Sequence, residues 1–141
     1  MSEIAAPSEL DRPRPAPVIL IVEDEVLVRA VIADHLREEG FKVIETGNAR
    51  EAMEVIASQE VVDLVFTDHN MPGGMDGRSL VAWLEHHRPG LPTILTSGAL
   101  APVVGEDADR SRFVAKPYQV LDVEHRIRKL LQPGRLPPTE C

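Results

Sequence analysis

The sequence predicts an α/β fold in which a five-stranded parallel sheet is covered by helices on both faces. The main observation is that the hydrophobic pattern switches repeatedly between apolar runs of strand length and apolar residues at a helical spacing. Strands that alternate with helices along a chain form a parallel sheet with right-handed crossovers. A second observation is the size of the chain, since 141 residues with 43% hydrophobic and 27% charged residues suit one globular domain.

Proline residues mark the expected limits of this domain. Seven of the 12 prolines lie in two outer segments, four of them within residues 7–17 and three within residues 133–138. Proline fixes φ and has no backbone N–H, so these segments suit extended, solvated chain. We therefore expect a flexible, Pro-rich tail at residues 1–16, one domain at residues 17–131 and a second flexible tail at residues 132–141, with no further domain.

The expected strands are short apolar runs. They lie at residues 18–22, 41–45, 64–67, 93–97 and 113–115. Apolar residues at a helical spacing follow four of them, at residues 28–36, 49–56, 80–84 and 120–130. Between residues 98 and 111, Pro102 and Gly105 interrupt any helix, so the fourth helix of the fold is expected to be short or irregular.

Helix boundaries are also visible in the sequence. Asn48 followed by Glu51 is typical of a helix N-terminus, and Asp76 lies at capping distance from the next helix, so we interpret it as a cap rather than a metal ligand. Gly40 stands where a helix C-cap is expected. Five strands in a domain of this size indicate a flavodoxin-like doubly wound sheet with strand order 2-1-3-4-5.

In such a sheet, ligands bind at the carboxyl ends of the strands, beside the switch in strand order between strands 1 and 3. The residues expected there are Glu23-Asp24-Glu25, Thr67-Asp68, Thr96-Ser97 and Lys116. Neighbouring carboxylates repel each other unless a cation joins them, and a hard divalent ion such as Mg²⁺ prefers oxygen ligands. Carboxylates, Mg²⁺, a lysine and a hydroxyl are together the groups that hold a phosphoryl group while a carboxylate oxygen attacks it.

Composition excludes several other functions. The formal net charge of −8 argues against a protein held to nucleic acid by phosphate contacts. The single cysteine, Cys141, allows neither an intramolecular disulfide nor a cysteine-based zinc site. No apolar run is long enough to span a membrane, and the N-terminus has no signal-peptide pattern. We therefore expect a cytoplasmic protein with no membrane contact.

Five motifs in order resemble the receiver domain of two-component response regulators. They are Val18–Glu25 (VILIVEDE), Thr67–Pro72 (TDHNMP), Met75–Gly77 (MDG), Pro92–Gly98 (PTILTSG) and Phe113–Pro117 (FVAKP). The resemblance implies that Asp68 is the phosphoacceptor. It also implies a Mg²⁺ site made of Asp24, Asp68, the supporting acid Glu23 and the backbone carbonyl of Asn70.

The same resemblance implies roles for the later motifs. Lys116 would pair with the phosphoryl oxygens, and its bond to Pro117 is typically cis in this family. The residues alone leave the switch hydroxyl open between Thr96 and Ser97, and the family's position favours Ser97. Phe113 takes the aromatic switch position. Glu23 departs from the commoner Asp, the loop at residues 73–74 is one residue longer than usual, and the segment from Ser97 to Lys116 is a little short.

These residues predict a single-domain response regulator in a phosphorelay. It would accept a phosphoryl group from a sensor histidine kinase or a histidine phosphotransfer protein, act on an unknown downstream protein, and exist as a monomer or weak dimer. It would not be an enzyme beyond its own phosphorylation and dephosphorylation. One alternative is a Mg²⁺-dependent phosphohydrolase, which would need an acid where Asn70 stands. The other is a pseudo-receiver that is never phosphorylated.

Overall fold

The computed structural model describes residues 15–58, 60–69, 76–97 and 113–131, which form a five-stranded sheet and four helices. The strands are β1 (Val18–Val22), β2 (Lys42–Thr46), β3 (Leu64–Asp68), β4 (Thr93–Ser97) and β5 (Phe113–Ala115). Every neighbouring pair is parallel, and the order is β2-β1-β3-β4-β5. The predicted fold class and strand order are therefore confirmed.

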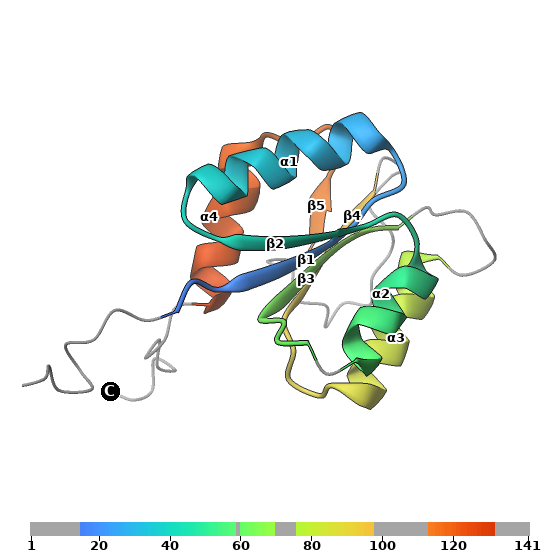
Figure 1. The fold of residues 1–141 in the computed structure, drawn as a ribbon. Helices are drawn as coiled ribbons and strands as arrows, with labels where there is room; N and C mark the ends of the chain where they lie inside the picture. The colour runs from blue at the N-terminus through green and yellow to red at the C-terminus, as the bar shows by residue number, and fades with distance from the viewer. Residues whose placement is uncertain (1–14, 59, 70–75, 98–112, 132–141) are drawn as a thin grey trace, which may run out of the picture.

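The helices cover both faces of this sheet (Figure 1). They are α1 (Val26–Glu38), α2 (Ala49–Ala57), α3 (Gly77–His87) and α4 (Val120–Leu131). Helices α1 and α4 lie on one face, and α2 and α3 lie on the other (Figure 1). The segment predicted to hold a short or irregular helix, residues 98–111, lies outside the described residues.

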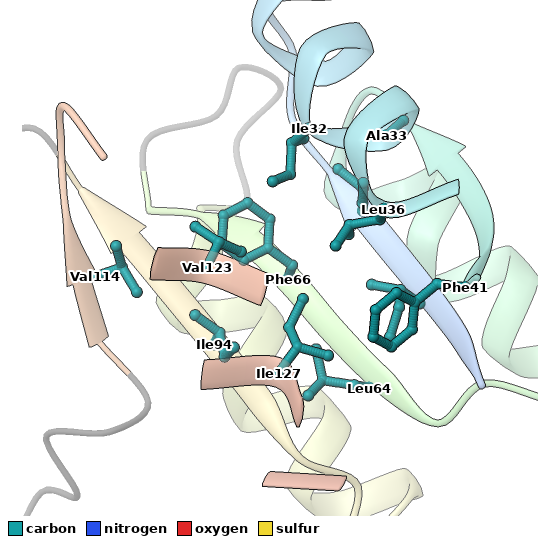
Figure 2. Close-up of a cluster of buried hydrophobic side chains, with 12 residues drawn as sticks. Ile32, Ala33, Leu36, Phe41, Leu64, Phe66, Ile94, Val114, Val123 and Ile127 are labelled. Atoms are coloured by element: carbon teal, nitrogen blue, oxygen red, sulfur yellow. The ribbon is translucent and has the colours of Figure 1, made fainter. Parts of the chain in front are cut away.

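Two hydrophobic clusters, one on each face, hold the layers together. Side chains of a strand point alternately to its two faces, so Ile19 and Ile21 of β1 pack with α1 and α4, whereas Leu20 and Val22 pack with α2 and α3. Figure 2 shows the first cluster, in which Phe66 of β3 lies among side chains from both helices. The uniformly apolar sequences of the central strands follow from this burial on both faces.

The helix boundaries agree with the sequence signals. Asn48 Oδ1 accepts a hydrogen bond of 2.8 Å from Glu51 N, and Asp76 Oδ1 accepts one of 2.9 Å from Ser79 N. The bond from the Ser79 backbone lowers the pKa of Asp76, which fits a cap that carries charge at a helix N-terminus. Both predicted caps are confirmed.

The start of β2 differs by one residue from the prediction. Gly40 has a φ of 100°, which favours glycine, and the N–H of Phe41 then bonds to Leu36 O at 3.0 Å. Phe41 therefore belongs to the turn that ends the helix, and β2 begins at Lys42 rather than at residue 41. Its ring is buried in the first cluster all the same.

Polar contacts join α1 to α4 at the rim of this cluster. His35 Nε2 lies 2.8 Å from Glu124 Oε1, and Arg128 Nε donates to Glu124 Oε2 at 2.8 Å. The bonds from Arg128 and His35 lower the pKa of Glu124. The Arg128 guanidinium also lies 4.8 Å from the centre of the Phe41 ring. These contacts connect the C-terminal helix to the N-terminal half of the fold.

Among the helices of the described residues, none combines the length and the apolar character that a crossing of the bilayer requires.

Ile127→Ala tests the packing of α4. Ile127 is fully buried, so its truncation removes apolar contacts and leaves a cavity, and we expect a loss of about 2–5 kcal/mol in the free energy of unfolding. Leu121→Ala on the same helix is the control, because Leu121 is 66% exposed and its truncation should change stability by less than about 0.5 kcal/mol. Urea denaturation measures both. Equal losses in the two variants would contradict the described orientation of α4.

Candidate functional site

The register of the sheet brings four strand ends together. Thr67 lies beside Val22, so Glu23, the next residue after β1, lies near Asp68, the last residue of β3. Ser97 of β4 lies beside Ala115, the residue before Lys116. The predicted site residues Glu23, Asp68, Ser97 and Lys116 therefore gather at one edge, where the strand order switches.

Three carboxylates form the centre of this edge. One oxygen from each of Glu23, Asp24 and Asp68 lies within 4.8 Å of the other two. Glu23 is 1% exposed and Asp68 is 4% exposed, whereas Asp24 faces solvent. Two of the three negative charges are thus buried beside each other, an arrangement that requires compensating positive charge.

Lys116 supplies part of that charge. Its Nζ donates a hydrogen bond of 3.1 Å to Asp68 Oδ2 and lies 3.6 Å from Glu23 Oε1. Burial alone would lower the pKa of Lys116, but the bond and charge of Asp68 and the charge of Glu23 raise it above its ordinary value. The acids therefore hold the lysine in its charged form beside Asp68.

The Lys116–Pro117 bond is cis, as the family resemblance implied.

Glu23 is fixed in place through both its side chain and its backbone. Its Oε2 accepts a bond of 3.0 Å from Glu25 N, and its backbone carbonyl accepts one of 2.9 Å from Arg29 Nη1. Burial raises the pKa of the Glu23 carboxyl, and the charges of Asp68 and Asp24 raise it further, so the proton is held more tightly than in water.

Arg29 was missed from the sequence. It lies in the first turns of α1, where the helix dipole disfavours a cation, and it also pairs with Glu45 Oε1 of β2 at 3.2 Å. A cation at a helix N-terminus, four residues after an acidic triplet, is the signal that could have indicated it. Its role is to connect the loop after β1 to the edge strand.

Gly77 permits the close approach that fixes the other side of the site. A Cβ atom at this position would clash with the backbone oxygen of Asp68 and with His69 Cα. Gly77 N instead donates to His69 O at 2.8 Å, and His69 N donates to Thr96 O at 2.7 Å. The first residue of α3 therefore packs directly on the end of β3 and limits the freedom of Asp68.

The remaining predicted residues divide into described and undescribed positions. Ser97 and Thr96 are both buried at the end of β4, and Ser97 O accepts a bond of 2.9 Å from Lys116 N. Phe113 is half-buried at the start of β5. Asn70, expected to offer its backbone carbonyl, lies outside the described residues.

The donor set fits a magnesium ion. All three converging side chains offer oxygen atoms, which are the ligands that Mg²⁺ prefers, and Asp24 is open to solvent so that the ion can keep several waters. Glu23 Oε1 is buried without a hydrogen-bond partner among the described residues. A divalent cation would lower the repulsion among these groups.

The family follows from a comparison with known proteins. The family model described as "Response regulator receiver domain" matches residues 19–128, most of the chain. The chain belongs to this family. Receiver domains act in two-component signalling, generally use Mg²⁺ at the acidic pocket, interact with histidine kinases or phosphotransfer proteins, and are generally not true enzymes.

Curated relatives carry the same domain within longer chains. The chain is 34% identical over 108 residues to the transcriptional regulatory protein PdtaR of Mycobacterium tuberculosis, and this match covers 74% of this chain and 52% of that protein. It is 30% identical over 125 residues to the transcriptional activator protein PfeR of Pseudomonas aeruginosa, covering 86% of this chain and 40% of that protein. The chain thus spans about half the length of the curated relatives or less.

Solved structures agree with the fold. The receiver domain of the hybrid histidine kinase CckA is 31% identical with a TM-score of 0.68, and the match covers 82% of this chain and 99% of that one. A CheY-like receiver domain protein from Methanospirillum hungatei is 26% identical with a TM-score of 0.74, and the match covers 82% of this chain and 94% of that one.

Glu23→Gln tests the electrostatics of this receiver site. The pKa of Glu23 is raised above 4.5 in the folded state, so near this pH the folded protein binds more protons than the unfolded one. The free energy of unfolding therefore falls as the pH rises from 4.5 through the pKa of the folded state, where Glu23 becomes charged. In the absence of Mg²⁺ we expect the variant to melt several degrees above the wild type at pH 7. Thermal melts at pH 7 and below pH 4 measure the difference. A variant that melts below the wild type at pH 7 would contradict the described balance of charges.

Proposed function

We propose that residues 17–131 act as a Mg²⁺-dependent phosphoacceptor in a phosphorelay, with Asp68 as the residue that is phosphorylated. The observation that carries this proposal is that Lys116 Nζ bonds to Asp68 Oδ2 at 3.1 Å while oxygens of Glu23 and Asp24 lie within 4.8 Å of Asp68. One carboxylate thus lies between a fixed cation and two further acids. A structural ion pair needs only one acid for its lysine.

The reaction is a phosphoryl transfer between a nitrogen and an oxygen. An Asp68 carboxylate oxygen forms a bond to phosphorus while the bond between phosphorus and an imidazole nitrogen of the donor breaks, and the electron pair of that bond returns to the imidazole. Lys116 moves from the carboxylate to the incoming phosphoryl oxygens and balances their charge. Hydrolysis of the acyl phosphate later releases inorganic phosphate and restores Asp68.

Glu23, Asp24, Asp68 and the backbone carbonyl of Asn70 would hold the magnesium ion. When bound, Mg²⁺ neutralises the charge that gathers on the phosphoryl oxygens. Asp24 is the direct ligand in this proposal because it faces solvent, and Glu23 acts from the buried side, often through a water.

Phosphorylation would be reported through the end of β4. Ser97 is buried and its carbonyl is already bonded to Lys116 N, so a hydrogen bond from the Ser97 hydroxyl to the phosphoryl group would draw this end of the strand inward. Phe113, two residues from Ala115 in the neighbouring strand, would then turn inward. Such a change selects between two states according to the affinity of each for the phosphoryl group.

The proposed donor is a phosphohistidine on a sensor kinase or a phosphotransfer protein. The output is contact with another protein, since the acidic charge of −8 disfavours direct binding to nucleic acid.

Asp68→Asn tests the phosphoacceptor. The amide is not a nucleophile, so the variant should gain no phosphoryl group from phosphoramidate or acetyl phosphate in the presence of Mg²⁺, whereas the wild type gains one. Intact-protein mass spectrometry measures the gain. Asp63→Asn is the control, because Asp63 lies at the opposite end of the sheet, where its Oδ2 accepts a bond of 2.7 Å from Val18 N. Labelling of Asp68→Asn at the wild-type rate would overturn the assignment.

Magnesium should stabilise the folded protein by mass action. At about 100 times its dissociation constant, Mg²⁺ adds about 2.7 kcal/mol to the free energy of unfolding, provided that the unfolded chain does not bind it. Differential scanning fluorimetry with and without Mg²⁺ measures the shift, and Asp24→Asn should reduce it. An unchanged melting temperature at millimolar Mg²⁺ would count against the metal site.

Turnover of added phosphomonoesters would favour the phosphohydrolase instead.

A further inference from the structure

Three buried polar atoms without partners belong to residues of the acidic site or next to it in the strands and loops. Within the part of the chain that the structure describes, Glu23 Oε1, Thr96 Oγ1 and the Tyr118 hydroxyl are each buried and make no hydrogen bond. A buried polar group left unpaired destabilises the folded state, so these three groups require an explanation.

The three residues lie on the same face of the sheet. Side chains alternate along a strand, so Glu23 lies on the side of Ile21, and Thr96 lies on the side of Ile94, the side that α1 and α4 cover. Tyr118 packs against the same cluster. Its ring meets Phe66 edge to face, with 5.6 Å between the ring centres and an interplanar angle of 86°.

Register and sequence spacing place Tyr118 and Thr96 near Asp68 at the carboxyl edge. Phe66 precedes Asp68 by two residues on β3, Tyr118 follows Lys116 by two residues, and Thr96 is paired with Asp68 across the β3–β4 ladder. The phenol thus lies against the strand that carries the phosphoacceptor.

The electrostatic surroundings of Tyr118 agree with this placement. Burial raises the pKa of its hydroxyl, and the charges of Glu23, Asp68 and Glu25 raise it further, Glu23 contributing most among the three. The phenol therefore keeps its proton and is available as a hydrogen-bond donor toward the acidic site.

Glu23 is the acid that needs such a donor. A glutamate has one more methylene, and so one more rotatable bond, than the aspartate usual at this position. Its Oε2 is fixed by Glu25 N, but within the described ranges its Oε1 has only the ion pair with Lys116 at 3.6 Å, beyond hydrogen-bond distance. When Lys116 turns toward a phosphoryl group, nothing else described in the structure fixes Oε1.

We propose that Tyr118 is a positioning residue for Glu23, its hydroxyl hydrogen-bonding to Glu23 Oε1 through one internal water shared with Thr96 Oγ1. An internal water makes about three hydrogen bonds, which is the number of unpaired atoms here. Carboxylates that ligate a metal are oriented by outer hydrogen bonds, whose removal commonly lowers metal affinity. This inference rests on the proposed function, since it assigns Tyr118 a role in the affinity of the site for Mg²⁺.

A double-mutant cycle on Mg²⁺ affinity tests the proposal. Tyr118→Phe keeps the ring against Phe66 and removes only the hydroxyl, and we expect it to weaken Mg²⁺ binding about tenfold by isothermal titration calorimetry. In the Glu23→Gln background, the same change should weaken binding much less, because the partner through which it acts is altered. Thr93→Val is the matched control, since it removes a buried hydroxyl at the other end of β4 that already bonds to Leu91 O.

A spectroscopic measurement observes the hydrogen bond itself. Tyr118 is the only tyrosine in the chain, so ultraviolet resonance Raman bands of tyrosine report its hydroxyl alone. We expect these bands in the wild type to be those of a phenol that donates a strong hydrogen bond to a bound water. In Glu23→Gln they should shift toward those of an unbonded phenol.

The outcomes separate this inference from the proposed function. If the wild type binds Mg²⁺ but Tyr118→Phe binds it equally well and melts at a higher temperature, the hydroxyl is an unpaired group with no role, and the inference is overturned while the metal site stands. An equal loss in both backgrounds also overturns it, because Tyr118 then acts independently of Glu23. If the wild type binds no Mg²⁺, both proposals fail.

Discussion

Every part of this receiver site depends on holding Glu23 and Asp68 buried and close together against their mutual repulsion. Two ionised acids in this position raise the free energy of the folded state unless positive charge lies between them. Lys116 provides it from the residue after β5, the edge strand that β3 and β4 separate from β1. The lysine and a metal ion would then share the neutralisation, and a phosphoryl group would bind where both reach.

The stability that offsets this repulsion between acids comes from the centre of the sheet. Strands β1 and β3 are buried on both faces, by α1 and α4 on one side and by α2 and α3 on the other. Their apolar side chains end at Val22, next to Glu23, and at Phe66, two residues before Asp68, so the same strands that form the core also position the charges at its edge. Arg29 then bonds to the carbonyl of Glu23 after β1, and Gly77 packs on the end of β3.

Much of the fold could be predicted because it depends on local patterns. The apolar runs, the caps at Asn48 and Asp76 and the glycine at position 40 each act over a few residues, and the structure agrees with them. The convergence of Glu23 with Asp68 followed from strand order alone. The contacts of Gly77 and Tyr118 could not be found in this way, because they depend on how separate elements pack, and the one sequence signal for Arg29 does not name its partner Glu45. The one-residue shift of β2 likewise arises from a turn bond made by Phe41.

The most direct test of the account is to locate the phosphoryl group. Wild-type protein is labelled with phosphoramidate and Mg²⁺, and reduction with borohydride then converts an aspartyl phosphate to homoserine, which peptide mass spectrometry identifies by residue. The account predicts homoserine at position 68 and at no other aspartate. Homoserine at Asp24 or Asp63, or a phosphoryl group that resists borohydride and maps to a histidine or serine, would contradict it.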